Sequence, residues 1–296
     1  MQKIILDTDI GDDIDDALAL TFALMSGEID LLGVTTVFKN AMQRAELACC
    51  VLEALGQKGI PVYAGIGMTI LQPILDWEEV MANHRPHQME ILKKQAPSIK
   101  PQSGRAVDFI IDTVMSGDGD ITLVPIGPLT NIATAFIIEP RLAQKAKICM
   151  MGGATDRVSP EWNARCDPEA TRIVFDTGVP ITMVGLDVTT KCVMHYDQVK
   201  AIGTVNRPIN QICFELIHLW GGNTPEPRPT LHDPLAVAML IDPTLCKRRR
   251  TRIMVETQSD HLRGATVPVP GDPNASVCVS VDADRFMDYF VKTLTS

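Results

Sequence analysis

The sequence predicts an α/β protein built on an open, mainly parallel sheet with helices on both faces. Short apolar runs of strand length alternate with helix-length segments along most of the chain. This alternation is typical of parallel strands joined by crossover helices, because each strand is then buried on both faces. No repeat and no low-complexity linker divides the 296 residues. We therefore expect a single domain over residues 1–296.

Six apolar runs are the predicted core strands, at Ile4–Asp7, Leu31–Val37, Val62–Ala64, Ile121–Pro125, Ile148–Met151 and Ile181–Gly185. The segments between them predict helices at Asp16–Met25, Met42–Leu55, Ala106–Met115, Leu129–Ile137, Pro168–Asp176 and Pro234–Leu240. The C-terminal part adds strands at Arg252–Glu256 and Ser276–Val281, and a closing helix near Ala283–Leu294. Residues 65–88 and 220–231 fit neither pattern. Loops this long are usually functional, and in such sheets they belong beyond the carboxyl ends of the strands.

Composition excludes several classes of partner. The chain carries 27 basic and 36 acidic side chains, a net charge of −9, whereas nucleic acid and anionic membranes attract basic surfaces. No apolar run approaches the roughly 20 residues that cross a bilayer, and the N-terminus shows no secretory signal. The eight cysteines form no CxxC pair. We expect free thiols and a cytoplasmic location.

An acidic turn follows the first predicted strand. Residues 7–16 read DTDIGDDIDD, which places six aspartates in ten positions before an apolar helix. Clustered carboxylates repel one another, and burying them is costly unless a cation compensates the charge. One aspartate could simply cap the helix while the others stay solvated, but capping needs only one. The cluster therefore favours a hard divalent cation, Ca²⁺ or Mg²⁺.

The segment DTDIGDDIDDALAL resembles the N-terminal signature of the nucleoside hydrolases, the inosine-uridine-preferring nucleoside N-ribohydrolase family. Agreement continues, in order and spacing, through TTVFKN, PIGPLTNIA, MGG, EWNARCDPEATRIVF and HDPLAVAML. The resemblance spans essentially the whole chain. It implies a Rossmann-like nucleoside hydrolase fold, one Ca²⁺ at the bottom of a deep pocket, and hydrolysis of the N-glycosidic bond of ribonucleosides to free base and ribose.

The resemblance also implies the metal ligands. Asp9 matches the aspartate that ligates calcium and, as general base, takes a proton from the calcium-bound water. Asp16 and Asp233 match the other carboxylate ligands, and Ile126 would contribute only its backbone carbonyl. Asp233 precedes a proline, so a helix start is its alternative role. The Asp-Pro pairs at 167 and 242 are expected to be helix starts only.

By the same resemblance, ribose hydroxyls would be bound by Asp15, Asn40, Glu161 and Asn163. For Asn40 and Asn163 ordinary turn chemistry is the alternative. The acidic turn is two residues longer than in many members of the family. Asp13 could therefore replace Asp15 at the sugar or join the metal, and Asp12 is expected to face water.

The leaving base is less well defined by the sequence. His232 matches a position that protonates or orients the base, a task that suits a group titrating near neutrality. Trp77 and Trp220 could stack on a base, although core packing is an equal alternative. Purine and pyrimidine substrates cannot be told apart from these residues.

Two other functions compete with the hydrolase. IILDTD also resembles the strand-ending motif of haloacid-dehalogenase-like phosphatases, and a non-catalytic calcium-dependent nucleoside-binding protein would keep the same pocket. A carboxylate-rich pocket favours the positive charge that builds on ribose as its C–N bond breaks. We therefore expect a small-molecule nucleoside as substrate, uncharged rather than phosphorylated. The resemblance further implies a homodimer or homotetramer.

Overall fold

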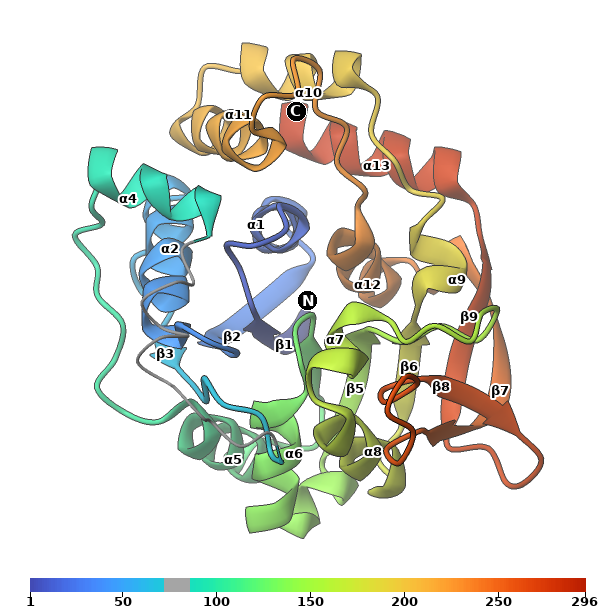
Figure 1. Ribbon diagram of the computed structural model, residues 1–296. Coiled ribbons are helices and arrows are strands. Elements are labelled where there is room, and N and C mark those ends of the chain that lie inside the picture. The colour runs from blue at the N-terminus through green and yellow to red at the C-terminus, as the bar shows by residue number, and fades with distance from the viewer. Residues whose placement is uncertain (72–85) are drawn as a thin grey trace.

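The protein is built on one nine-stranded sheet, which the computed structural model describes over residues 1–71 and 86–296 (Figure 1). The strand order is β3-β2-β1-β4-β5-β6-β9-β7-β8. Pairing is parallel from β3 through β9, and β7 and β8 add an antiparallel ribbon at one edge. The predicted fold class, an open and mainly parallel α/β sheet, is confirmed.

The strands are β1 (Gln2–Thr8), β2 (Ile29–Thr36), β3 (Val62–Ala64), β4 (Ile121–Pro125), β5 (Ala146–Met151), β6 (Ile181–Val184), β7 (Cys246–Val255), β8 (Thr266–Val269) and β9 (Ala275–Val281). The α-helices are α1 (Asp15–Met25), α2 (Ala41–Ala54), α4 (Glu90–Lys94), α5 (Ala106–Ser116), α6 (Thr130–Ile138), α7 (Trp162–Cys166), α8 (Pro168–Asp176), α9 (Leu186–Thr189), α10 (Tyr196–Thr204), α11 (Pro208–Gly221), α12 (His232–Ile241) and α13 (Ala283–Thr295). Short 3₁₀ turns are η1 (His87–Met89), η2 (Pro140–Gln144) and η3 (Pro243–Leu245).

Two helical layers cover the sheet. One face packs against α1, α2, α12 and α13, with α10 and α11 outside them, and the other face packs against α5, α6 and α8 (Figure 1). The alternation of side chains along β1 illustrates the division. Ile4 and Leu6 belong to the first core and Ile5 to the second, as the two-residue period of a strand requires.

The C-terminal half departs most from the sequence-based expectation. β7 begins at Cys246, six residues before the predicted strand, because its first half is a run of basic residues that lacks an apolar pattern. β8 and the helices between residues 186 and 221 were not predicted. The stretch expected as a loop from Trp220 onward starts inside the last turn of α11. In β7 basic residues replace the apolar signal, whereas α11 is apolar and packs in the main core.

Two further expectations concern the whole chain. All eight cysteines are free and buried, as predicted for thiols that pack as small apolar groups. Within residues 1–71 and 86–296, no helix combines the length and the hydropathy that crossing a bilayer requires. Trp77, a candidate base-stacking residue, lies outside the described residues.

Candidate active site

The acidic turn connects β1 to α1 at the carboxyl edge of the sheet. Asp15 and Asp16 form the first turn of α1, and both side chains are buried. Asp233, far away in the sequence, lies beside them in the first turn of α12. One carboxylate oxygen from each of these three residues lies within 4.8 Å of the other two. This spacing matches oxygens that share a calcium ion, since each Ca–O distance is about 2.3–2.6 Å.

Three of the four Asp-Pro pairs of the chain, at 167, 233 and 242, differ in what the aspartate contacts. Asp167 caps α8 by accepting the Ala170 N–H at 3.0 Å, and Asp242 caps η3 by accepting the Thr244 N–H at 3.0 Å. Asp233 makes no such cap, because α12 starts before it and Leu231 occupies the cap position. Its N–H instead donates to the Asp15 carboxylate at 3.2 Å. The Asp233 carboxylate therefore does not cap its own helix and lies with the carboxylates of Asp15 and Asp16.

A cavity of about 510 Å³ opens above the trio. It brings together most of the residues that the sequence singled out, from five separate segments of the chain. The lining residues are Asp9, Asp12, Asp13, Asp15, Asp16, Lys39, Ile126, Met151, Glu161, Trp162, Asn163, Leu186, Trp220, His232 and Asp233. Asp9 lies outside the close trio but lines the same cavity, and the geometry adds Asp15 to the candidate metal ligands.

Burial of so many carboxyl groups shifts their protonation. Desolvation raises the pKa of Asp9 to about 7, against the opposing pull of Arg44. Desolvation also raises the pKa of Asp15, Asp16 and Asp233 well above the usual value, and their mutual repulsion adds to the shift. Without a cation, the carboxyl groups of the site thus favour the protonated form. Shifts of this kind are typical of functional sites, and here they indicate that a bound cation would stabilise the ionised carboxylates.

Asp7, the first aspartate of the turn, has a different environment. It is fully buried in β1, where its carboxylate accepts hydrogen bonds from Thr35 at 2.6 Å and Asn131 at 2.7 Å. Desolvation raises its pKa to about 7. The residue corresponds to the nucleophile of a haloacid-dehalogenase-like phosphatase, and in this position it faces no cavity. The phosphatase alternative therefore lacks its nucleophile.

Arg44, which the sequence did not single out, ties the acidic turn to α2. Its guanidinium is completely buried and donates to the backbone carbonyls of Asp9, Ile10 and Phe38, the last at 2.8 Å. It also forms an ion pair with Asp12 at 2.7 Å. The expectation that Asp12 faces water is wrong, because its side chain is only 33% exposed and binds this cation. A lone arginine inside a helix gives no sequence signal for such a role.

The second inserted aspartate, Asp13, is exposed at the cavity mouth, where its carboxylate accepts the Ile14 N–H at 2.7 Å. The backbone carbonyl of Asp13 accepts a hydrogen bond from Gln88 at 2.5 Å. Asp13 is not a member of the close trio. Its contact with ribose remains a prediction.

Glu161 and Asn163 stand on the opposite wall of the cavity. Glu161 is buried and caps α7, accepting N–H groups from Gly153 at 2.9 Å and Asn163 at 2.7 Å. The Asn163 side-chain amide donates to the Ile126 carbonyl at 2.9 Å, which fixes the orientation of that carbonyl. Next to it, a Cβ on Gly127 would lie 2.7 Å from Asp9 Oδ1. The chain can approach Asp9 this closely only because that residue is glycine.

Asn40 has a structural role in the described contacts. Its side chain caps α2 by accepting the Gln43 N–H at 3.2 Å, and it is absent from the residues that line the cavity. Lys39, its neighbour, does line the cavity. Phe38 and Lys39 adopt φ values of 70° and 54°, an uncommon conformation for residues with side chains. Strained backbone of this kind is concentrated at functional sites.

His232 reaches the cavity from the start of α12. Its Nδ1 lies 2.7 Å from the Thr189 hydroxyl, and burial lowers its pKa to about 4. The imidazole is therefore neutral near pH 7. It can orient a leaving base through a hydrogen bond, whereas a stored proton would require a higher pKa.

Two tryptophans border the cavity mouth. Trp220 lines it from the last turn of α11 and also packs against the main core. Trp162 lines it from α7 with 55% of its surface exposed. Large exposed aromatic rings are rare unless they meet a ligand, so Trp162 is a base-stacking candidate that the sequence reading did not assign. Its position directly after Glu161 was the available signal.

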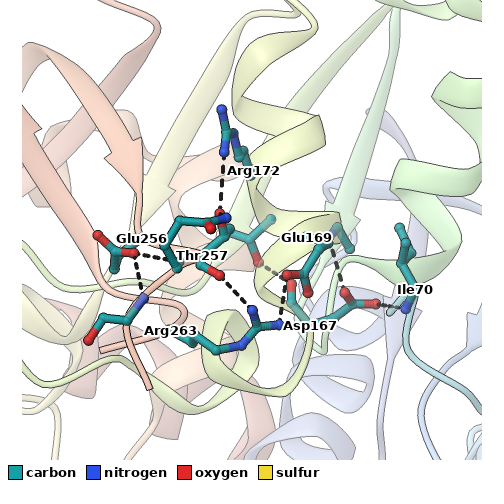
Figure 2. A network of polar contacts seen from close by, with 11 residues as sticks. Ile70, Asp167, Glu169, Arg172, Glu256, Thr257 and Arg263 are labelled. Carbon is teal, nitrogen blue, oxygen red and sulfur yellow. Dashed lines mark hydrogen bonds and ion pairs between the residues drawn. The ribbon is translucent and has the colours of Figure 1, made fainter. Parts of the chain in front are cut away.

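A polar network behind α7 holds this wall in place (Figure 2). Asp167 accepts the Ile70 N–H at 3.1 Å, so the segment after β3 is fixed to the start of α8. Arg263 donates to Glu169 at 2.7 Å and to the Thr257 carbonyl at 2.5 Å. The network thereby joins three separate segments into a rigid support for the residues of α7.

Comparison with known proteins identifies the family. The profile of the inosine-uridine preferring nucleoside hydrolases matches residues 4–288. This chain belongs to that family. It is 36% identical to the pyrimidine-specific ribonucleoside hydrolase RihB of Escherichia coli O157:H7, over 96% of this chain and 94% of the relative.

Solved nucleoside hydrolases share the fold. A plant nucleoside hydrolase, the PpNRh1 enzyme, superposes with a TM-score of 0.85 at 28% identity, covering 100% of this chain and 99% of the other. The purine-preferring ribonucleoside hydrolase from Gardnerella vaginalis gives 0.85 at 29% identity, covering 99% and 98%. This nucleoside hydrolase is therefore an enzyme that cleaves the N-glycosidic bond of ribonucleosides.

Proposed function

We propose that this nucleoside hydrolase is calcium-dependent and that Asp9 is its general base. The observation that carries the proposal is the convergence of Asp15, Asp16 and Asp233 on one point at the bottom of the cavity. Three buried carboxylates so close together need a cation for charge balance. An all-oxygen donor set of this kind suits calcium better than zinc or copper.

The residues present fit such an ion. Asp15, Asp16 and Asp233 would hold it, with the Ile126 carbonyl as a further oxygen ligand within the same cavity. Bound calcium would lower the pKa of a coordinated water and orient the ribose diol. Asp16 is already oriented for this task by a 2.5 Å hydrogen bond from Thr8.

Asp9 is placed to take the proton. Without a cation, desolvation raises the pKa of Asp9 to about 7. A bound calcium would favour the ionised carboxylate, which is the form that accepts a proton. The backbone of Asp9 is fixed by Arg44 from one side and approached by Gly127 from the other. We infer that Asp9 deprotonates the attacking water while the surrounding carboxylates favour the positive charge developing on ribose.

Ribose and base would lie on opposite parts of the cavity. Asp15, Glu161 and Asn163 offer polar groups for the sugar hydroxyls, while Trp162, Trp220 and neutral His232 stand nearer the mouth for the base. Because the walls are acidic, an uncharged nucleoside is favoured over a nucleotide. Two of the three named relatives differ in base preference: RihB is pyrimidine-specific and the Gardnerella vaginalis enzyme is purine-preferring. Both classes of nucleoside therefore belong in the assay.

The experiment measures free base released from a panel of ribonucleosides with calcium, with a chelator, and after calcium is restored. We expect turnover that chelation stops and calcium restores. Asp9→Asn should lower kcat by about 10²–10⁴-fold, the usual contribution of a general base. Tight nucleoside binding without base release would favour the non-catalytic alternative, and undiminished kcat in Asp9→Asn would exclude Asp9 as the base.

The proposal also covers the oligomeric state, the number of domains and the cellular location. We propose a homodimer or homotetramer and a single domain over residues 1–296. The cytoplasmic location stays a prediction.

A further inference from the structure

A second cavity, larger than the first, lies at the amino ends of the parallel strands. It has a volume of about 670 Å³ and lies away from the catalytic site. The sheet register shows how it is built. Thr122 pairs with Lys147, Thr182 pairs with Ser276, and Ser276 pairs with Arg250. Thr182 also pairs with Cys149, two residues beyond Lys147, so the register runs unbroken only through Thr182, Ser276 and Arg250. Lys147 lies on the same face, one two-residue step nearer the start of the strands. Lys147, Thr182, Ser276 and Arg250 thus form a staggered row across β5, β6, β9 and β7, with Thr122 beside Lys147 on β4.

This row is unusual for its place in the fold. Buried parallel strands are normally apolar on both faces, and Val124, Cys149 and Val184 on this face are packed in the core. Lys147, Thr182, Ser276 and Arg250 instead place an ammonium, two hydroxyls and a guanidinium on four adjacent strands. The end of α12, at Leu240, borders the cavity and leaves the row uncovered.

The charge at this edge opposes that of the whole chain. The net charge is −9, yet Lys147, Arg250 and Arg252 line the cavity against Asp176 and Asp272. Asp176 is already shared by Arg252 at 3.8 Å and Arg172 at 3.7 Å. Three basic side chains thus face two carboxylates, so the cavity carries a net positive charge.

Protection of a sheet edge does not account for the whole row. Charged residues on edge strands prevent strands of other molecules from pairing, and that reading covers Lys247, Arg249 and the rest of the basic run in β7. Lys147, however, lies on β5 in the middle of the sheet, between β4 and β6. A central strand has no free edge to protect.

We propose that this row binds a phosphate group, either inorganic phosphate or the phosphomonoester of a small metabolite. The Lys147 ammonium and the Arg250 guanidinium stand on either side of two hydroxyl groups, a donor set that matches the charge and the several acceptor oxygens of phosphate. We name the set Lys147, Thr182, Ser276 and Arg250 the phosphate row. α12 runs from this cavity to the catalytic site, with Leu240 at one end and Asp233 at the other.

The test is direct binding, measured by calorimetry at constant ionic strength, with inorganic phosphate, ribose 5-phosphate and unphosphorylated ribose as probes. Inorganic phosphate is titrated into chelator-treated protein, so that calcium phosphate cannot form. We expect saturable binding of phosphate or ribose 5-phosphate. The stronger of the two identifies the source, and ribose alone reports any binding at the catalytic site.

The decisive variant is Lys147→Ala/Arg250→Ala, with Lys247→Ala/Arg249→Ala as its matched control. Both remove one lysine and one arginine, but the control pair lies outside the cavity. We expect binding to weaken at least tenfold in the first and to stay within about twofold in the second, because one charged hydrogen bond contributes about tenfold. Thr182→Val should weaken binding several-fold without changing the net charge.

Three results would overturn the proposal. They are the absence of saturable phosphate binding in the wild type, an equal loss in both double variants, and a change in oligomeric state caused by Lys147→Ala/Arg250→Ala. The last would make the cavity an interface between copies of the chain. None of these measurements depends on calcium or on base release, so the proposed catalytic mechanism can fail without affecting the result.

Discussion

The two ends of the sheet carry opposite charge. At the carboxyl ends of the strands the cavity is lined by buried aspartates, whereas at the amino ends the cavity is lined by Lys147, Arg250 and Arg252. Both are hollows of several hundred Å³. The net charge of −9 is therefore a sum over two distinct surfaces, and it describes neither of them.

The ends also differ in how charge is stabilised. The acidic cavity is dry enough to raise the pKa of its carboxyl groups, and one buried cation, Arg44, compensates it from below. At the basic cavity, Lys147 and Arg250 are exposed to solvent. A buried cluster of one sign needs a counter-ion, while an exposed one merely attracts one. The comparison predicts a tight, metal-dependent site at one end and a weaker, salt-sensitive site at the other.

The largest effect is expected from the acidic trio. Asp233→Asn should reduce calcium affinity and kcat/KM by a hundredfold or more, because one charged ligand of a three-carboxylate set is lost. Asp242→Asn is the matched control, since it has the same local sequence and asparagine caps helices as well as aspartate does. Calcium titration and base release measure both. Equal losses in the two variants would mean that Asp233 acts through its helix and not through a metal.

The acidic end could be predicted from the sequence because its residues are close together there. Six aspartates in residues 7–16 follow one strand, so their meeting needs no knowledge of the fold. Asp233 needed the family resemblance, because local sequence makes it look like the helix-capping Asp167 and Asp242. The strands that form the core were predicted for a similar reason, since each is a local apolar run.

The remaining features are not local. Arg44 acts through contacts with Asp9, Ile10 and Phe38, which only the packing of α2 on the turn creates. The phosphate row takes one residue from each of four strands, and a single Thr or Lys in a strand carries no signal. The first half of β7 was not predicted as a strand, because its basic residues lack the alternating apolar pattern. The sequence did not predict those sites whose side chains are brought together by strand register or by the packing of distant segments.

A smaller effect is expected on how the thermal stability of the metal-free protein depends on pH. Between about pH 5 and pH 8 lysine and arginine keep their charge, so only the acidic end titrates. Its carboxyl pKa values are raised in the folded state, to about 7 for Asp9. Such groups stabilise the fold fully below their unfolded pKa, and that stability is lost as pH rises through the folded pKa. The metal-free protein should therefore melt several degrees lower at pH 8 than at pH 5.

Calcium should reverse this trend, since it replaces the bound protons as the compensating charge. Thermal melting with a chelator and with calcium, at both pH values, measures the difference. A metal-free protein whose melting temperature rises from pH 5 to pH 8 would contradict the raised pKa values. Lys147→Ala/Arg250→Ala should show the same pH response as the wild type, because it leaves the carboxyl groups of the acidic end unchanged.

The smallest effect is expected from the ion pair between the buried Arg44 and Asp12 in the acidic turn. Asp12→Asn should lower the free energy of unfolding by about 1 kcal/mol, because it removes the charge that Arg44 binds at a half-exposed position. Asp13→Asn is the matched control: the next residue is equally acidic, but its described carboxylate bond is to a backbone N–H. Urea unfolding with a chelator measures both. If Asp12→Asn were stabilising, relief of carboxylate repulsion would outweigh the ion pair, and Arg44 alone would not compensate the turn.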